Sequence, residues 1–351
     1  MVFSLLLIAP AAAAAEPEMD PALRSQAQRA VDGGLRYLRT HQAPDGSWSG
    51  SVGVTAIALR AFLESHRRYS EADGAFITRP VAFILEHVNE DGWIGEAHLN
   101  RNYNTAVAIV ALQATANAKY APIIANAQEF LAGLQIDGGE GYDKGHAYYG
   151  GIGYGGDERP DLSNQYLAIE ALRASSFDPQ SPVWERAKLF LDRCQNRSES
   201  NDQAWAGNDG GFTYMPGFSP HGGTASYGGM THAGLISLLF AGVDKSDPRV
   251  QAAYDWIRAN YTLERNPGAR DASGLYYYYE VFAKSMAAFG ESSVVTSDGT
   301  TRNWREDLTR KVLSLQHEDG SWVNSESPRW WEDDKNLITA RMVVALNLTT
   351  R

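Results

Sequence analysis

Five side chains of this sequence could exchange protons with a substrate, and four of them are carboxylic acids. They are Asp161, Glu280, Asp333, Asp334 and the imidazole side chain His232. Positioned carboxyl groups and histidines are the usual general acids and bases of enzymes. Glu280 follows four consecutive tyrosines, and a carboxylate in such a setting is costly to bury unless it is paired or protonated. We therefore predict these five as the catalytic residues if the protein is an enzyme.

Each of the five also has a structural interpretation. Glu280 could be held in a salt bridge, and His232 could be a hydrogen-bonded core side chain. Asp333 and Asp334 could place capping charge on a helix that begins directly after them. Asp161 could serve to tie its own loop together. The residue types leave both interpretations open.

A second group of residues could hold a ligand rather than transform it. Residues 137–156 contain nine glycines and four tyrosines, and further aromatic and amide side chains precede other predicted helices. Tyrosine and tryptophan rings suit either an isoprenoid chain or the faces of sugar rings. The predicted ligand-binding residues are Tyr103, Asn104, Tyr154, Arg159, Asn164, Gln165, Tyr227, Tyr276, Tyr279, Trp330 and Trp331.

The elements that must position these residues repeat along the chain. The heptapeptide Gln-x-x-Asp-Gly-Ser-Trp occurs at residues 42–48 and again at residues 316–322. Apolar residues at helical spacing precede the first copy, its glycine can end that helix, and an almost wholly apolar segment follows. Each unit therefore reads as an outer helix, a turn and a buried inner helix.

The predicted inner helices share a signature in which a starting residue is followed seven positions later by Leu or Met. The starting residues are Val52, Thr105, Gln165, Thr231, Tyr279 and Thr339, spaced by 48 to 66 residues. Positions seven apart lie on one face of a helix, two turns apart. Six such units predict an all-α fold, an (α/α)6 toroid in one closed domain. The predicted repeats cover about residues 25–65, 75–117, 122–175, 183–242, 248–290 and 302–348.

These motifs resemble those of a known superfamily. The Gln-x-x-x-Gly-x-Trp turns resemble the QW repeats of squalene and oxidosqualene cyclases, and the predicted toroid resembles the β subunits of protein prenyltransferases. Residues 154–164, 274–279, 321–324 and 329–332 look like segments of exported prenyltransferase/squalene-oxidase-repeat proteins of bacteria. The resemblance covers roughly residues 30–348, and it implies the toroid fold and terpenoid-type chemistry.

The functional motifs of that superfamily are missing at the matching positions. Class II cyclases use an acid in an Asp-x-Asp-Asp-Thr-Ala motif, but the residues before the starting residues here are Asn104, Asn164, Met230 and Ile338. The prenyltransferase zinc pair Asp-x-Cys has a counterpart in Asp192 and Cys194, which fall at the end of an outer helix. We predict no metal site and no cofactor. The missing cyclase acid weakens the terpenoid assignment.

Composition and the first residues limit the remaining choices. The chain has 351 residues, 44% of them hydrophobic, and a formal net charge of −11, which argues against nucleic acid as a partner. Residues 1–15 are apolar and end in small residues, as in a signal peptide cleaved near Ala15. We expect an exported, periplasmic or extracellular protein without a transmembrane segment, and its oligomeric state is open.

Three functional hypotheses follow. The first is an exported toroid that binds an extended isoprenoid-like or glycan ligand in an aromatic central cleft. The second is a carboxylate-dependent enzyme acting on polysaccharides, and the third is a non-catalytic interaction module of the envelope. Two carboxyl groups at the mouth would favour the second. A closed apolar cavity would favour an isoprenoid, and a cavity filled by its own tyrosines would favour the third.

Overall fold

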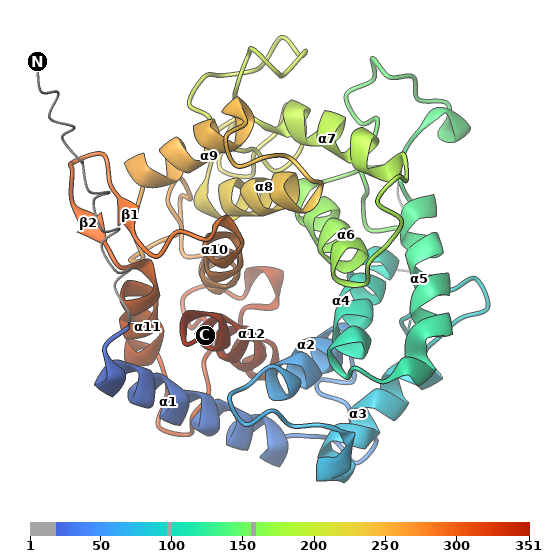
Figure 1. The fold of residues 1–351 in the computed structure, drawn as a ribbon, viewed down its shortest axis with the longest axis vertical. Helices are drawn as coiled ribbons and strands as arrows, with labels where there is room; N and C mark the ends of the chain where they lie inside the picture. Colours follow the sequence, from blue (N-terminus) through green and yellow to red (C-terminus); the bar gives the residue numbers. More distant parts are fainter. Residues whose placement is uncertain (1–18, 97–99, 156–158) are drawn as a thin grey trace, which may run out of the picture.

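Two concentric rings of helices make up the protein. Within residues 19–96, 100–155 and 159–351, which the computed structural model describes, twelve α-helices alternate between an outer and an inner position (Figure 1). This arrangement confirms the predicted all-α toroid in one domain. The predicted signal peptide, residues 1–15, lies outside the described residues. In the described part of the chain, every helix is too short or too polar to span a bilayer.

The inner ring is built from the six apolar helices. Each contacts the next around the ring, and the last also contacts the first, so that the ring is closed. Burial extends around nearly the whole circumference of these helices, as expected of elements packed on every side. They are α2 (Val52–Leu63), α4 (Arg101–Ala114), α6 (Leu162–Ala174), α8 (Gly228–Phe240), α10 (Leu275–Phe289) and α12 (Lys335–Thr349).

The outer helices are amphipathic and bury one face against the inner ring. In the first of them, the buried side chains Leu23, Ala27, Val31 and Leu38 recur at helical spacing. The first and last outer helices lie side by side (Figure 1). The outer helices are α1 (Pro21–Thr40), α3 (Ala75–Glu86), α5 (Ala121–Gly133), α7 (Val183–Cys194), α9 (Pro248–Ala259) and α11 (Trp304–Ser314).

Short elements occupy the connections. A two-stranded antiparallel hairpin pairs β1 (Val294–Val295) with β2 (Thr301–Arg302) beside α11. Four 3₁₀ turns complete the described secondary structure: η1 (Glu71–Asp73), η2 (Ala118–Tyr120), η3 (Gly138–Glu140) and η4 (Arg329–Trp331).

The repeated glutamine joins four of the six units to the next. Gln42 donates its side-chain amide to the carbonyl oxygens of Gly46, in its own turn, and Phe76, in the following outer helix, both at 3.1 Å. Gln135 and Gln195 make the corresponding pairs of hydrogen bonds in their units. Buried carbonyl oxygens need such partners, so the recurrence of this residue has a direct structural cause.

The rest of the heptapeptide and the inner-helix signature meet at the same turn. The indole nitrogens of Trp48 and Trp322 donate to carbonyl oxygens of the preceding outer helices, at 2.7 and 2.8 Å. Their backbone nitrogens donate to the hydroxyls of Thr55 and Thr339, at 3.0 and 3.1 Å. In the first unit the accepting residue is therefore Thr55 and not Val52, the predicted starting residue. Gly320 has a φ of +87°, and a Cβ there would lie 2.6 Å from a backbone oxygen of the first outer helix. The motif therefore fixes the angle between outer and inner helices.

Candidate functional site

A cavity of about 300 Å³ opens at the end of the ring where the inner helices begin. Tyr103, Asn164, Tyr277 and Leu337 reach it from the first turns of α4, α6, α10 and α12, and Tyr227 reaches it from the residue before α8. The first turns of several inner helices therefore surround the same space. We call this space the mouth cavity.

The walls of the mouth cavity are aromatic but rich in polar groups. Its sixteen lining residues include five tyrosines, two tryptophans and three asparagines, and only two are aliphatic, Met230 and Leu337. Six of the residues predicted to bind a ligand border it: Tyr103, Tyr154, Asn164, Tyr227, Trp330 and Trp331. The cavity is therefore neither a closed apolar cavity nor a space filled by the protein's own side chains.

The other predicted ligand-binding residues lie outside the cavity lining. Asn104 is buried and donates to Glu96 at 3.1 Å, and Gln165 accepts a hydrogen bond from the backbone of Ile152 at 2.8 Å. In this unit the Gln165 side chain thus accepts the backbone N–H of the turn, which a threonine hydroxyl accepts in four other units. Arg159 is exposed to solvent and does not line the cavity.

Tyr276 and Tyr279 lie on the side of α10 turned away from the cavity. The Tyr279 hydroxyl donates to the carbonyl oxygen of Leu263 at 2.7 Å, and the two rings pack edge to face. The neighbouring Tyr277 is the one that borders the cavity. A run of four tyrosines cannot indicate which member points inward, because successive residues on a helix differ by about 100° in direction.

Two of the predicted catalytic positions have clear structural partners. His232 is buried, its Nδ1 lies 2.5 Å from the Ser285 hydroxyl, and burial lowers its pKa to about 3. Asp334 caps α12 by accepting hydrogen bonds from the backbones of Asn336 and Leu337, at 2.8 and 3.0 Å. Asp333, beside it, is exposed. None of the three lines the mouth cavity.

Asp161 lies directly behind the cavity wall. It is 2% exposed and caps α6, accepting hydrogen bonds from the backbone and the side-chain amide of Asn164 at 3.0 and 2.7 Å. It is also hydrogen bonded to the hydroxyl of Tyr214, which borders the cavity and interacts in turn with the Tyr154 hydroxyl. Burial raises the pKa of Asp161 to about 6.

Glu332 brings a second buried carboxyl group to the cavity, and this one is part of the lining. It accepts hydrogen bonds from the backbones of Leu275 and Tyr277, at 3.1 and 2.8 Å, and from the Asn324 amide at 2.7 Å. Burial raises its pKa despite these donors. Sequence reasoning missed Glu332 because a loop glutamate after two tryptophans carries no signal of burial.

Trp330 and Trp331 stand at the open side of the cavity. Their side chains are 42% and 55% exposed, and both have a positive φ, 59° and 61°. The left-handed region is unfavourable for bulky residues, and such strain is typical of sites that hold ligands. The Arg329 guanidinium lies 4.3 Å from the centre of the Trp330 ring.

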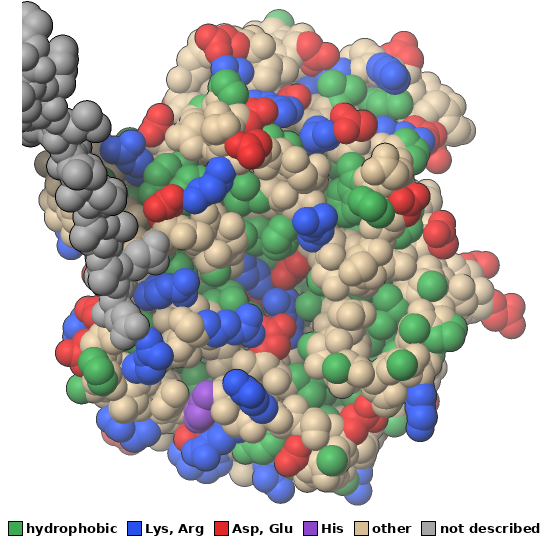
Figure 2. Space-filling view, viewed as in Figure 1, with side chains coloured by type: hydrophobic (Ala, Val, Ile, Leu, Met, Phe, Trp, Pro, Cys, Tyr) green, Lys and Arg blue, Asp and Glu red, His purple; other side chains and the backbone are tan. Residues whose placement is uncertain are grey.

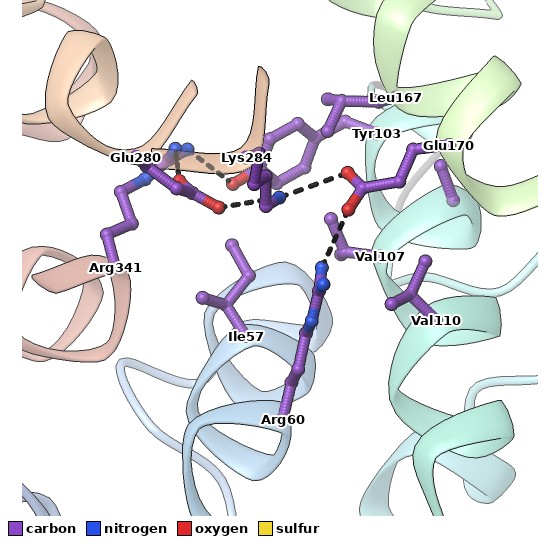
Figure 3. Close-up of a pocket in the computed structure, with 11 residues that line it drawn as sticks. Ile57, Arg60, Tyr103, Val107, Val110, Leu167, Glu170, Glu280, Lys284 and Arg341 are labelled. Atoms are coloured by element: carbon purple, nitrogen blue, oxygen red, sulfur yellow. Dashed lines mark hydrogen bonds and ion pairs between the residues drawn. The ribbon is translucent and has the colours of Figure 1, made fainter. Parts of the chain in front are cut away.

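Below the mouth cavity, the centre of the ring is filled by charged side chains of alternating sign (Figure 3). We call Arg60, Glu170, Lys284, Glu280 and Arg341 the axial charge cluster. The Lys284 ammonium lies 2.8 Å from Glu280 and 3.0 Å from Glu170, and Arg60 lies 2.9 Å from Glu170. Figure 2 shows acidic and basic side chains gathered in the hollow at the middle of the ring.

The cluster determines the surroundings of Glu280, the fifth predicted catalytic residue. Glu280 is paired with both Lys284 and Arg341, and it lines a small space inside the cluster rather than the mouth cavity. Burial acts to raise the pKa of Glu280, but the two cations outweigh it and the pKa is lowered. Burial likewise acts to raise the pKa of Glu170, but Lys284 and Arg60 outweigh it and lower this pKa to about 2.

Arg341 and Tyr103 connect the two spaces. Both border the mouth cavity and also the space inside the cluster, and the Arg341 Nη2 lies 3.3 Å from the Tyr103 hydroxyl. Arg341 was not predicted as a site residue. Its role depends on pairing with Glu280, 61 residues away in the sequence, which no local pattern reveals.

The residues that resembled a zinc pair have other partners. Asp192 forms an ion pair with Arg249 at 3.1 Å, and Cys194 is buried at the end of α7. Within the described residues, no group of three or more His, Cys, Asp or Glu side chains is arranged to hold a metal ion.

Comparison with known proteins identifies the fold. No protein-family model matches the chain. An inactive variant of the alpha-1,6-mannanase GH76A of Salegentibacter sp. HEL1_6, in complex with alpha-1,6-mannotriose, matches with a TM-score of 0.57 at 11% identity, over 92% of this chain and 99% of that one. A glycosidase in complex with glucose matches with a TM-score of 0.51 at 11% identity, over 95% and 100%.

A protein geranylgeranyltransferase-I of Candida albicans, complexed with GGPP, matches with a TM-score of 0.47 at 14% identity, over 88% of this chain and 98% of that one. At such identities a likeness shows the fold alone. The specific QW-repeat family therefore stays a prediction.

Proposed function

We propose that this protein binds an oligosaccharide in the mouth cavity. The observation that carries the proposal is the lining itself, which combines seven aromatic rings with amide, hydroxyl and charged groups. Sugar rings present apolar faces that pack on aromatic side chains, and edges of hydroxyls that require hydrogen-bond partners. The lining offers both.

An isoprenoid chain fits the same lining less well. Burying a hydrocarbon against Asn164, Glu332 and Arg341 would remove water from these groups without supplying hydrogen bonds in return. Only two aliphatic side chains are present to compensate. The cavity is also open at the tryptophan side, whereas a reactive hydrocarbon is usually enclosed.

Polysaccharide cleavage is a second candidate, favoured by the two buried carboxyl groups with raised pKa values at this cavity. Glu332 lines it and Asp161 lies behind Tyr214. A carboxyl group with a raised pKa can act as a general acid at the glycosidic oxygen while a second carboxylate acts on the opposite side of the bond. Glu332→Gln should then lower turnover about 100-fold or more, since the amide cannot protonate the leaving group. The amide keeps one of the two oxygens that accept hydrogen bonds from α10.

Export belongs to the proposal as well. It rests on the signal-like composition of residues 1–15, and an exported protein would meet extracellular or envelope glycans. Detection of the protein in the periplasm or medium, with an N-terminus near residue 16, tests this part separately.

A thermal-shift screen tests the binding proposal. The purified protein is heated with maltotriose, alpha-1,6-mannotriose, xylotriose and chitotriose, and separately with geranylgeranyl diphosphate. A ligand at 100 times its Kd stabilises the folded state by about 2.7 kcal/mol, so a bound trisaccharide should raise the Tm. A rise with geranylgeranyl diphosphate alone would favour the isoprenoid instead, and no rise with any compound would favour the interaction module.

A further inference from the structure

The mouth cavity has a closed floor. Beneath Arg341 and Tyr103, the axial charge cluster and the aliphatic side chains of α2, α4 and α6 occupy the centre of the ring (Figure 3). The space left among them is about 20 Å³. A cavity needs about 10–15 Å³ on this measure to hold one water molecule, so the gap can hold a single water but not a sugar.

The exposure of the lining residues shows the direction of the cavity. At the deep end, the side chain of Arg341 is 11% exposed. At the other end, Trp330 and Trp331 are about half exposed. A ligand therefore enters past the tryptophans and stops at the arginine.

We infer that the mouth cavity binds the end of a glycan chain, with the terminal sugar against Arg341 and Tyr103 and the next sugars leaving over Trp330 and Trp331. The inference rests on the proposed function. An internal segment of a chain has two continuing ends and needs a groove with two exits, whereas this cavity is closed at its floor. Its volume of about 300 Å³ is at the small end of ligand pockets and suits a short terminal fragment.

The chemistry of the floor fits a terminal sugar. The last sugar of a chain carries a free hydroxyl where an internal sugar carries the glycosidic bond, and this hydroxyl can both donate and accept. Arg341 supplies charged N–H donors and Tyr103 a phenol at the deep end. Hydrogen bonds to charged groups are the stronger ones, so loss of that hydroxyl should weaken binding markedly.

The test compares free and blocked ends of the same trisaccharides. Maltotriose, alpha-1,6-mannotriose, xylotriose and chitotriose are titrated calorimetrically into the purified full chain in four forms. The forms are unmodified, converted to the methyl glycoside at the reducing end, methylated at the chain-extending hydroxyl of the non-reducing sugar, and blocked at both ends. Blocking one particular end should weaken binding of the recognised trisaccharide at least tenfold, and the identity of that end shows its orientation.

A result in which the doubly blocked form binds as well as the unmodified form would overturn the inference but leave glycan binding intact. Absence of binding in all four series would reject the proposed function itself, and the inference with it.

Two conservative variants locate the effect at the floor. Tyr103→Phe removes one hydroxyl without changing the ring, and it should reduce the free-to-blocked affinity ratio at least threefold. Tyr276→Phe removes a hydroxyl from a buried tyrosine outside the lining and should leave the ratio unchanged. Equal ratios in the wild type and Tyr103→Phe would place end recognition elsewhere and contradict the assignment.

Discussion

The Trp330 indole packs directly over Gly274, the residue before α10: a Cβ added to Gly274 would lie 3.0 Å from the Trp330 Cζ3 atom. Both residues border the mouth cavity. The start of an inner helix thus supports one of the two exposed tryptophans, and the position of that ring depends on the absence of a side chain at residue 274.

Gly274→Ala should therefore weaken glycan binding as well as stability. The φ of +70° at Gly274 costs an alanine roughly 1–2 kcal/mol, and the added methyl group displaces the Trp330 ring. Gly290→Ala is a matched control, because Gly290 has a φ of +80° at the other end of α10 with open space around it. Calorimetric titration should show weaker binding only for Gly274→Ala. Equal affinities in the two variants would show that Trp330 does not contact the ligand.

Asp161 should make stability depend on pH in an unusual direction. Because its pKa is about 6 in the folded protein and 3.8 in the reference state, the folded state binds the proton more tightly between these values. The contribution of Asp161 to stability is therefore present below about pH 4 and is lost as the pH rises to about 6. The difference of about two between these pKa values corresponds to roughly 3 kcal/mol of unfolding free energy.

Asp161→Asn removes this dependence while keeping a good helix cap. Denaturant unfolding at pH 4, 5, 6 and 7 should show the stability of the variant rising relative to wild type across this range. Asp20→Asn, at the exposed cap of α1, serves as the control and should give parallel curves. If the unfolding free energy of Asp161→Asn also runs parallel to that of the wild type across this pH range, Asp161 is not a buried acid with a raised pKa.

The axial charge cluster should be sensitive to loss of its central cation. Lys284→Met removes the ammonium group shared by Glu170 and Glu280 and leaves each carboxylate with one arginine. Breaking a buried ion pair in this way typically costs 3–5 kcal/mol. Lys245→Met removes an exposed pair with Glu291 and should cost less than about 1 kcal/mol. The free energy of unfolding of both variants is measured by chemical denaturation. Similar losses in Lys284→Met and Lys245→Met would show that water reaches the cluster freely.

Ring closure should depend on the last copy of the repeated glutamine. Gln316 donates its amide to the carbonyl oxygen of Ala30 in the first helix at 2.9 Å and to Gly320 at 3.0 Å. Gln316→Ala leaves both oxygens without this donor, which should cost about 1–3 kcal/mol. Gln251→Ala, which removes an exposed amide hydrogen bond to Lys245, should be nearly neutral. Hydrogen exchange in α1 should rise only in Gln316→Ala, and unchanged exchange there would contradict the closing role.

Much of the architecture is predictable from sequence because the repeated residues make the same contacts in several units. Gln42 and Gln316 bridge consecutive outer helices, and Thr55 and Thr339 receive the backbone N–H of the turn tryptophans. A pattern that recurs for a local geometric reason can be recognised without coordinates.

The site is less predictable because its parts are set by long-range packing. The loops before the inner helices indicated Trp330 and Tyr154, which border the cavity. Tyr277 and Glu332, which adjoin predicted residues, border it too, as do Tyr214 and Arg341. The sequence around these four does not tell which side chains point inward. Glu280 shows the converse: its sequence setting suggests a reactive acid, whereas two cations from within the ring surround it.

Calorimetric titration of the purified protein with the four trisaccharides, repeated on the double variant Trp330→Ala/Trp331→Ala, tests the central claim most directly. Phe218→Ala, which removes another exposed aromatic side chain that does not line the cavity, is the control. Saturable binding of a trisaccharide to the wild type and to Phe218→Ala, weakened at least tenfold in the double variant, is the predicted result. Undiminished binding in the double variant, or binding of geranylgeranyl diphosphate with none of any trisaccharide, would contradict it.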